Sequence, residues 1–252
     1  MKRIYMCLVA GMAIGIGGAA AHAASFVIPG TASIWLAGQP SGTSDSGYFG
    51  SDTTPANSSV LVSVTGGQIL TFSASGLTSV DGLCFAGPDG GCYSDQSGDS
   101  PAPVSGDYNG PADALIGVFL NSGAGPIPIS NVGGYLEPTG FVAGLDYQAS
   151  SNANESLSAY SPSLNQVFFI GDGLTGTGTG SVQQFTVPTG ADSLFLAVGD
   201  SVGGSANNLG SLNVTVSGIT ASPIPEPSTL TLLGSGLVGL AGLVRRKLAS
   251  RA

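Results

Sequence analysis

Short β-prone runs, separated by stretches rich in Gly, Ser, Thr, Asn and Pro, make up the chain between residues 24 and 222. Several runs alternate apolar and polar residues, as residues 211–216 do, which is the period of a strand with one buried face. No window in this range has a convincing amphipathic helical pattern. We therefore expect an all-β body, a single β-sandwich of jelly-roll type. The expected strands are residues 33–36, 60–64, 69–74, 114–120, 166–170, 182–187, 193–198 and 211–216.

Positive charge is confined to the two ends of the chain. All six Lys and Arg residues lie before Ile4 or after Val244, while all fifteen Asp and Glu residues lie between Asp45 and Glu226. The body, residues 24–222, also has no His, which excludes a Ser-His-Asp triad, and its lack of basic side chains excludes nucleic acid as a partner. The oxygen ligands that remain, from Asp, Asn, Ser, Thr and the backbone, suit calcium better than zinc or copper.

The N-terminal segment has the three parts of a secretory signal. Lys2 and Arg3 form the positive region, residues 4–20 are apolar, and Ala21-His22-Ala23 is a small-x-small cleavage site. We predict a signal peptide at residues 1–23, removed by signal peptidase, and an exported domain at 24–222. A buried N-terminal helix is the alternative, but its many glycines would weaken such a helix.

The C-terminal segment, residues 223–252, also has three parts. An apolar run at 229–244 and a basic end at 245–252 follow a short motif, Pro225-Glu226-Pro227-Ser228. The prolines favour an extended, accessible chain. The sixteen-residue run would span about 24 Å as a transmembrane helix. Snorkelling Lys and Arg side chains would help it to fit a hydrocarbon core of about 30 Å, and the basic end predicts a cytoplasmic C-terminus.

This order of motif, apolar helix and basic cluster resembles the PEP-CTERM sorting signal of Gram-negative bacteria. The resemblance implies that a membrane cysteine enzyme, an exosortase, recognises the tail and cuts near the P-E-P motif. The body would first be held in the inner membrane by the C-terminal helix and would then pass to the cell surface or the extracellular matrix. A plain one-helix membrane anchor is the alternative.

Two cysteines, Cys84 and Cys92, remain after processing and lie eight positions apart. Because the protein is exported, we expect them to form a disulfide rather than two free thiols. Closing this small loop would stabilise the fold by about 2–3 kcal/mol.

The stretch 194–216 holds the most promising set of oxygen ligands. Asp200 follows a predicted strand, Gly203 and Gly204 allow the next loop to curl, and Asn207 and Asn208 follow. One carboxylate and two amides could supply much of the coordination that calcium prefers. From composition alone, a hairpin connection in which Asp and Asn merely favour turns is the leading alternative.

The same stretch resembles the closing calcium loop and last strand of the bacterial calcium-dependent, galactose-binding lectins of the PA-IL type. The resemblance covers roughly residues 59–216, is best in the last quarter, and implies a fold like that of galactose-binding domains. It places the calcium ligands at Asp200, Asn207, Asn208 and the carbonyls of Gly204 and Val80. It places sugar contacts at Asp95 and Gln96, and at Tyr93, where the family has His. The cysteines depart from the family pattern, because they precede the Asp95-Gln96 pair instead of following it.

These features predict an exported, surface- or matrix-sorted binding protein that is not an enzyme, and that binds calcium and, through it, carbohydrate. In the lectin mechanism, sugar hydroxyls replace water at the ion and an aromatic ring packs against the sugar. Candidates for that ring are Trp35, Tyr48, Tyr93 and Tyr108. A structural matrix or biofilm protein without a sugar ligand is the alternative. An enzyme with paired carboxylates is disfavoured, because no sequence pattern pairs the acidic residues.

Overall fold

The alternating pattern near the end of the body forms its longest strand, β13 (Leu209–Thr220). Leu212, Val214 and Val216 on one face of this strand are buried, while Asn213 between them is exposed. This is the period-2 burial that the sequence predicts for a strand with one face on the core. The computed structural model describes residues 21–91, 93, 108, 110–142 and 155–220, all within one compact unit, Ala21–Thr220.

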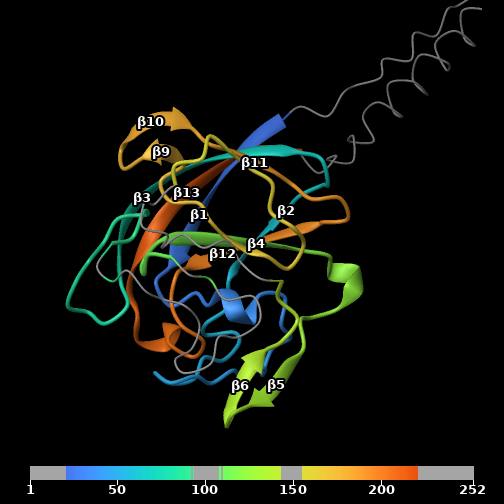
Figure 1. Ribbon diagram of the computed structural model, residues 1–252, viewed down its shortest axis with the longest axis vertical. Coiled ribbons are helices and arrows are strands. Elements are labelled where there is room, and N and C mark those ends of the chain that lie inside the picture. Colours follow the sequence, from blue (N-terminus) through green and yellow to red (C-terminus); the bar gives the residue numbers. More distant parts are fainter. Residues whose placement is uncertain (1–20, 92, 94–107, 109, 143–154, 221–252) are drawn as a thin grey trace, which may run out of the picture. The chain divides into compact units, whose positions relative to one another are not determined.

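Strand β13 lies near the middle of a five-stranded sheet (Figure 1). It pairs antiparallel with both β1 (Ala21–Pro29) and β3 (Ile69–Ser79). Two short strands, β11 (Gln184–Thr186) and β7 (Ala159–Tyr160), complete the order β1-β13-β3-β11-β7.

The second sheet has four strands in the order β2-β12-β4-β8. Its central pair, β12 (Ser193–Val198) and β4 (Leu115–Leu120), is antiparallel. The flanking strands are β2 (Val60–Ser63) and β8 (Val167–Phe169). Two hairpins lie outside these sheets: β5 (Ile129–Val132) with β6 (Tyr135–Pro138), and β9 (Leu174–Gly176) with β10 (Thr179–Val182).

An aromatic cluster joins the two large sheets. Phe185 on β11 stacks on Tyr160 at a centroid distance of 4.8 Å and meets Phe72 edge-on at 5.0 Å. Its ring also lies 5.7 Å from that of Phe168 on β8, in the opposite sheet. The sheets therefore share one core, and the body is an all-β sandwich with almost no helix. The jelly-roll connectivity is a finer assignment than these sheets establish, and it stays a prediction.

The predicted strand at 33–36 is wrong. Ser33 makes a single bridge to Ser58, and the following residues form a 3-10 helix, η1 (Ile34–Leu36), with all three side chains buried. A strand with one solvent face would expose alternate side chains, whereas η1 contacts β12 and β4 of the four-stranded sheet. All six residues of β4 are buried, as expected for a strand covered on both faces.

The predicted strand at 182–187 is also interrupted. Gln183 is fully buried, and its Nε2 donates hydrogen bonds to the carbonyls of Glu155 (2.7 Å) and Leu157 (2.9 Å). Since this side chain turns inward, β10 ends before it and β11 begins after it. These interactions join residues far apart in the sequence, so the local pattern does not contain them.

Strand β1 was not predicted, because its first residues fall in the expected signal peptide. Ala21 pairs with Thr220 and Pro29 with Ser211. A cut after Ala23 would leave residues 24–29 paired with β13, so the predicted boundary is compatible with the sheet and stays a prediction. The segment 1–20 lies outside the described residues.

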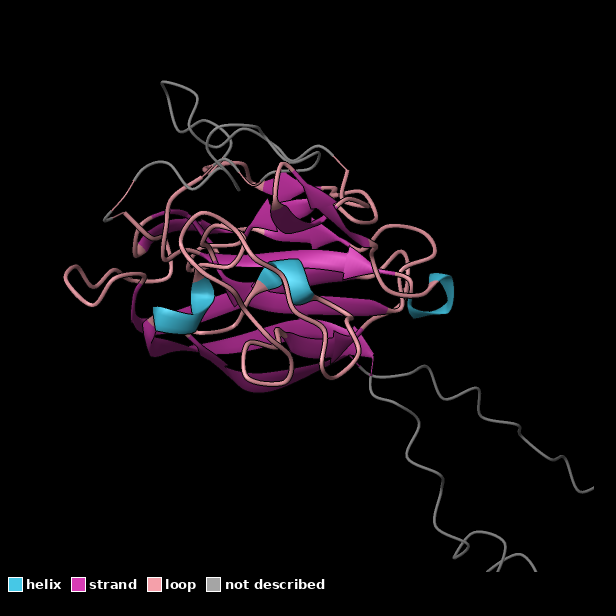
Figure 2. Ribbon diagram, turned by 90° about the horizontal axis from the view of Figure 1, so that it is seen from below, coloured by secondary structure: helices cyan, strands magenta, loops and turns pink. Residues whose placement is uncertain are grey.

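Three 3-10 helices, η1, η2 (Ser122–Ala124) and η3 (Ser205–Asn207), lie outside the strands (Figure 2). Within the described ranges, none of the helices is long and apolar enough to cross a membrane. The expected transmembrane helix at 229–244 lies outside these ranges.

Candidate ligand-binding pocket

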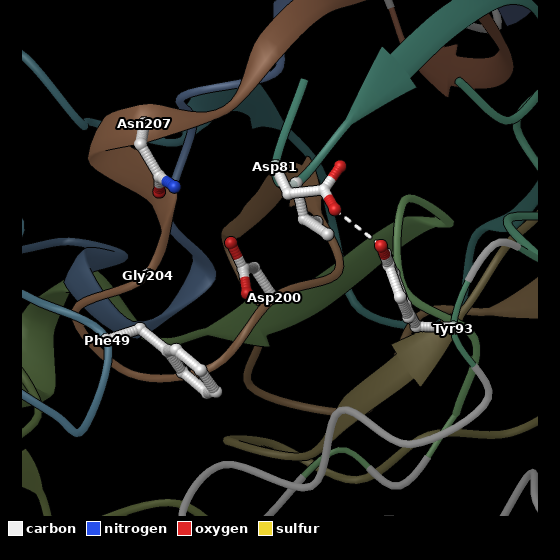
Figure 3. A pocket seen from close by; sticks show the side chains of 7 residues that line it. Phe49, Asp81, Tyr93, Asp200, Gly204 and Asn207 are labelled. Carbon is white, nitrogen blue, oxygen red and sulfur yellow. Dashed lines mark hydrogen bonds between the residues drawn. The ribbon is translucent and has the colours of Figure 1, made fainter. Parts of the chain in front are cut away.

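A cavity of about 320 Å³ lies where β3 and β12 end and β13 begins (Figure 3). The loop after β3 contributes Val80 and Asp81, and the loop between β12 and β13 contributes Asp200, Gly204 and Asn207. Phe49 and Tyr93 complete the lining. Five of the residues singled out from the sequence therefore meet at one cavity: Val80, Tyr93, Asp200, Gly204 and Asn207.

Asp200 is held from two sides. The indole Nε1 of Trp35 donates a hydrogen bond to its carbonyl oxygen (2.8 Å), and the amide of Ser201 donates to its Oδ1 (2.7 Å). The residue is only 5 % exposed. Burial raises the pKa of the Asp200 carboxyl to about 7, although hydrogen bonds from Ser201 and Asn208 oppose the shift. The buried carboxylate is therefore short of positive charge.

Gly204 leaves room for that carboxylate. Its φ of −93° is ordinary for any residue, so backbone strain does not require glycine here. A Cβ atom would instead lie 2.8 Å from Asp200 Oδ1 and 3.0 Å from Asp200 Oδ2. A side chain at this position would displace the Asp200 carboxylate from its present place.

The side-chain amides of Asn207 and Asn208 differ in their exposure. Asn207 ends η3 and is exposed at the cavity (Figure 3). Asn208 is buried, and its Nδ2 donates a hydrogen bond to the carbonyl of Gly30 (3.1 Å). That bond fixes the orientation of the amide, and the buried Oδ1 has no hydrogen-bond partner among the described residues. Asn208 does not line the cavity, so of the two predicted amide ligands the structure brings only Asn207 to the same cavity as Asp200.

Asp81 and Tyr93 form a hydrogen-bonded pair on another wall. The Tyr93 hydroxyl donates to Asp81 Oδ2 (Figure 3), and the amide of Leu83 donates to Oδ1 (2.7 Å). These hydrogen bonds, that from Tyr93 first, hold the pKa of Asp81 below its usual value. The bond to Asp81 in turn raises the pKa of the Tyr93 hydroxyl. Asp81 is therefore a stable carboxylate at the rim of the cavity.

Asp113 adds a further buried charge. It is fully buried with φ of 68°. Burial, followed by the charge of Asp81, raises the pKa of Asp113 to about 6. The charges of Asp52 and Asp113 in turn raise the pKa of Asp200.

This acidic group has no basic partner in the sequence. No Lys or Arg occurs between Ile4 and Val244. Buried carboxylates without a counter-charge either take up protons or bind a metal ion. The described residues contain no cluster of three or more His, Cys, Asp or Glu that could hold a metal. The predicted ligand set does not depend on such a cluster, because it combines one carboxylate with amide and carbonyl oxygens, which is a calcium-like donor set.

The described residues do not test several of the sequence predictions. Asp95, Gln96, Cys92 and the motif at 225–228 lie outside the described residues. Cys84 is disulfide-bonded, but the other two cysteines of the chain also lie outside those residues, so its pairing with Cys92 stays a prediction.

Of the candidate aromatic residues, Trp35 and Tyr108 are buried in the core and do not line the cavity. Sequence reasoning missed Phe49, Asp81 and Asp113. The Asp-Gly turn after the third predicted strand was the available signal for Asp81.

Comparison with known protein families found a match in the C-terminal tail. Residues 223–247 match the PEP-CTERM protein-sorting motif. This match implies an exported protein that is processed by an exosortase and transiently anchored in the membrane at its C-terminus. A search of curated proteins found no match, and it gives the lectin resemblance of the body no support. Residues 223–247 therefore carry a PEP-CTERM sorting signal.

Proposed function

We propose that the exported body is a non-catalytic binding module whose pocket takes up a calcium ion and, through it, the hydroxyl groups of a carbohydrate. The observation that carries this proposal is the convergence of Val80, Asp200, Gly204 and Asn207 on one cavity. These residues come from two separate strand connections, and the cavity they line has a buried carboxylate with no basic partner.

The ligand set would consist of oxygen atoms. Asp200 would supply a carboxylate, Asn207 and Asn208 their amide oxygens, and Val80 and Gly204 their carbonyls. Bound calcium would neutralise Asp200 and offer its remaining coordination positions to sugar hydroxyls. Asp81, at the rim, could accept hydrogen bonds from hydroxyls of the same sugar.

The sorting tail supports a final place at the cell surface or in the extracellular matrix, where polysaccharide is the natural carbohydrate ligand. The absence of Lys, Arg and His from residues 24–222 supports a binding role over catalysis, because no side chain of these types is present to orient or tune a catalytic carboxylate.

Calcium titration of the full chain in detergent micelles tests the ion. We expect the wild type to bind one calcium ion, and Asp200→Asn to weaken that binding about 100-fold because it removes the only ligand charge. Gly204→Ala should weaken it about tenfold, because its Cβ crowds Asp200. Gly87→Ala is the matched control, since no heavy atom lies within 4 Å of its Cβ position. Wild-type affinity in Asp200→Asn would refute the assigned site.

A glycan array probed with calcium and with a chelator tests the carbohydrate. We expect binding that the chelator abolishes and that Asp200→Asn removes. Binding that survives both treatments would show that the sugar does not depend on this ion. Calcium that raises the melting temperature without any glycan binding would instead support a structural matrix protein.

A further inference from the structure

An exposed hairpin beside the cavity carries two aromatic side chains at its tip. Ser44 and Thr53 form an antiparallel bridge, and their hydroxyls lie 2.9 Å apart. The amide of Gly47 donates to the carbonyl of Gly50 (2.9 Å), so Tyr48 and Phe49 are the two residues of the turn. We call residues 44–53 the aromatic hairpin.

The aromatic hairpin is fixed to the loop that carries Asp200. Asp52 is fully buried, and its Oδ2 accepts a hydrogen bond from the amide of Ser205 (3.2 Å) in η3. The tip also packs closely on Gly203, where a Cβ would lie only 2.6 Å from the amide nitrogen of Gly47. The protein itself therefore sets the position of Phe49 relative to Asp200.

The two rings at the tip face solvent. Tyr48 is 65 % and Phe49 69 % exposed, and the rings meet edge-on with centroids 5.0 Å apart. Phe49 nevertheless lines the cavity, and Figure 3 shows its ring near Gly204 and Asp200. A large apolar ring exposed to water at the edge of a polar cavity is typical of a binding surface.

The cavity thus combines two kinds of surface. Asp81, Asp200 and Asn207 present oxygen atoms, and Phe49 presents an aromatic face. A pyranose ring matches both, because it has hydroxyls along its edge and a flat patch of C–H groups on its face. An open-chain polyol has the hydroxyls but no rigid C–H face.

We propose that Phe49, held by the aromatic hairpin, is a specificity-determining residue that stacks on the C–H face of a pyranose ring whose hydroxyls occupy the oxygen-lined side of the cavity. This inference rests on the proposed calcium-dependent function of the same cavity. It adds a residue and an element that the sequence analysis did not assign, and it restricts the ligand to cyclic sugars over flexible polyols.

Calorimetry on the full chain in detergent, saturated with calcium, tests the proposal. The probes are the methyl pyranosides of galactose, glucose, mannose and fucose, with mannitol as the open-chain polyol. We expect at least one pyranoside to bind more tightly than mannitol in the wild type. Phe49→Ala should weaken that pyranoside about tenfold and leave mannitol unchanged, because only the pyranoside loses a stacking partner. Phe49→Tyr should retain most of the affinity.

Leu61→Ala is the matched control, since Leu61 is an exposed apolar residue on β2 that does not line the cavity. The calcium affinity of Phe49→Ala should equal that of the wild type. If the protein binds calcium but no pyranoside, or if Phe49→Ala weakens pyranoside and mannitol equally, the stacking proposal is overturned while the calcium site stands. A wild type that does not bind calcium overturns both proposals.

Discussion

Replacing Phe185 with alanine is expected to lower the free energy of unfolding of the body by about 3–5 kcal/mol. The ring is fully buried and contacts Tyr160, Phe72 and Phe168. Its removal opens a cavity at the point where the two sheets meet, because Phe168 belongs to the four-stranded sheet and the others to the five-stranded sheet. Packed neighbours in both sheets cannot collapse into such a space without moving a strand.

Denaturant unfolding followed by circular dichroism measures this loss. For a body of this size, each kcal/mol corresponds to about 2–4 °C in Tm, so the variant should melt at least about 6 °C below the wild type. Phe49→Ala is the control, because the same truncation at an exposed position should change stability by less than about 0.5 kcal/mol. Equal effects of the two substitutions would show that Phe185 does not join the sheets.

In the presence of a chelator, the stability of the body is expected to fall as the pH rises from about 4 to about 7. The pKa of Asp200 is raised to about 7 and that of Asp113 to about 6, both mainly by burial. Raised pKa values mean that the folded state holds protons which the unfolded state releases near pH 4. The stabilisation is complete below that pH and is lost as the pH passes the folded-state values.

The raised pKa values set an upper limit on this loss of stability. One pKa unit corresponds to about 1.4 kcal/mol, so Asp200 alone accounts for up to about 4 kcal/mol across the window. Asp81 and Asp192 have lowered pKa values and act in the opposite sense, but only below about pH 4, where the unfolded carboxyls titrate.

Urea unfolding at a series of pH values, with and without calcium, measures the dependence. Asp200→Asn should reduce the fall in stability in chelator but not abolish it, because the amide does not titrate while Asp113 and Glu155 still do. Calcium should restore stability to the wild type near pH 7.5 and have little effect on the variant. Chelated wild-type protein that becomes more stable between pH 4 and 7 would contradict the unpaired burial of these carboxylates.

Local patterns were sufficient for all four strands of the four-stranded sheet and for β3 and β13 of the other sheet. The predicted strand at 193–198 has the bounds of β12, a short apolar run that is buried on both faces. Strand β13 contains the predicted 211–216, because one of its faces packs on the core and imposes a period of two. The pattern failed at η1, where three consecutive apolar residues are all buried in contact with β12 and β4, so no alternation is needed.

Some residues of the pocket could be predicted from the local sequence, and others could not. Val80, Asp200, Gly204 and Asn207 could be singled out because their spacing resembles a known loop, and the structure brings them to one cavity. Phe49 and Asp113 could not, because their roles depend on which loops pack together. Phe49 matters only because Asp52 binds the amide of Ser205, which lies 153 positions later in the chain.

The pairing of Ala21 with Thr220 has a consequence for processing. Ala21 and Thr220 lie at one end of this pair of strands, and the pocket lies at the other end of the twelve-residue β13, about 36 Å away. The predicted signal-peptide cut after Ala23 would therefore fall at the end of β1 that lies far from the pocket. The cut would release only the first three residues of β1 from their pairing, so the strands next to the pocket would keep all their partners after processing.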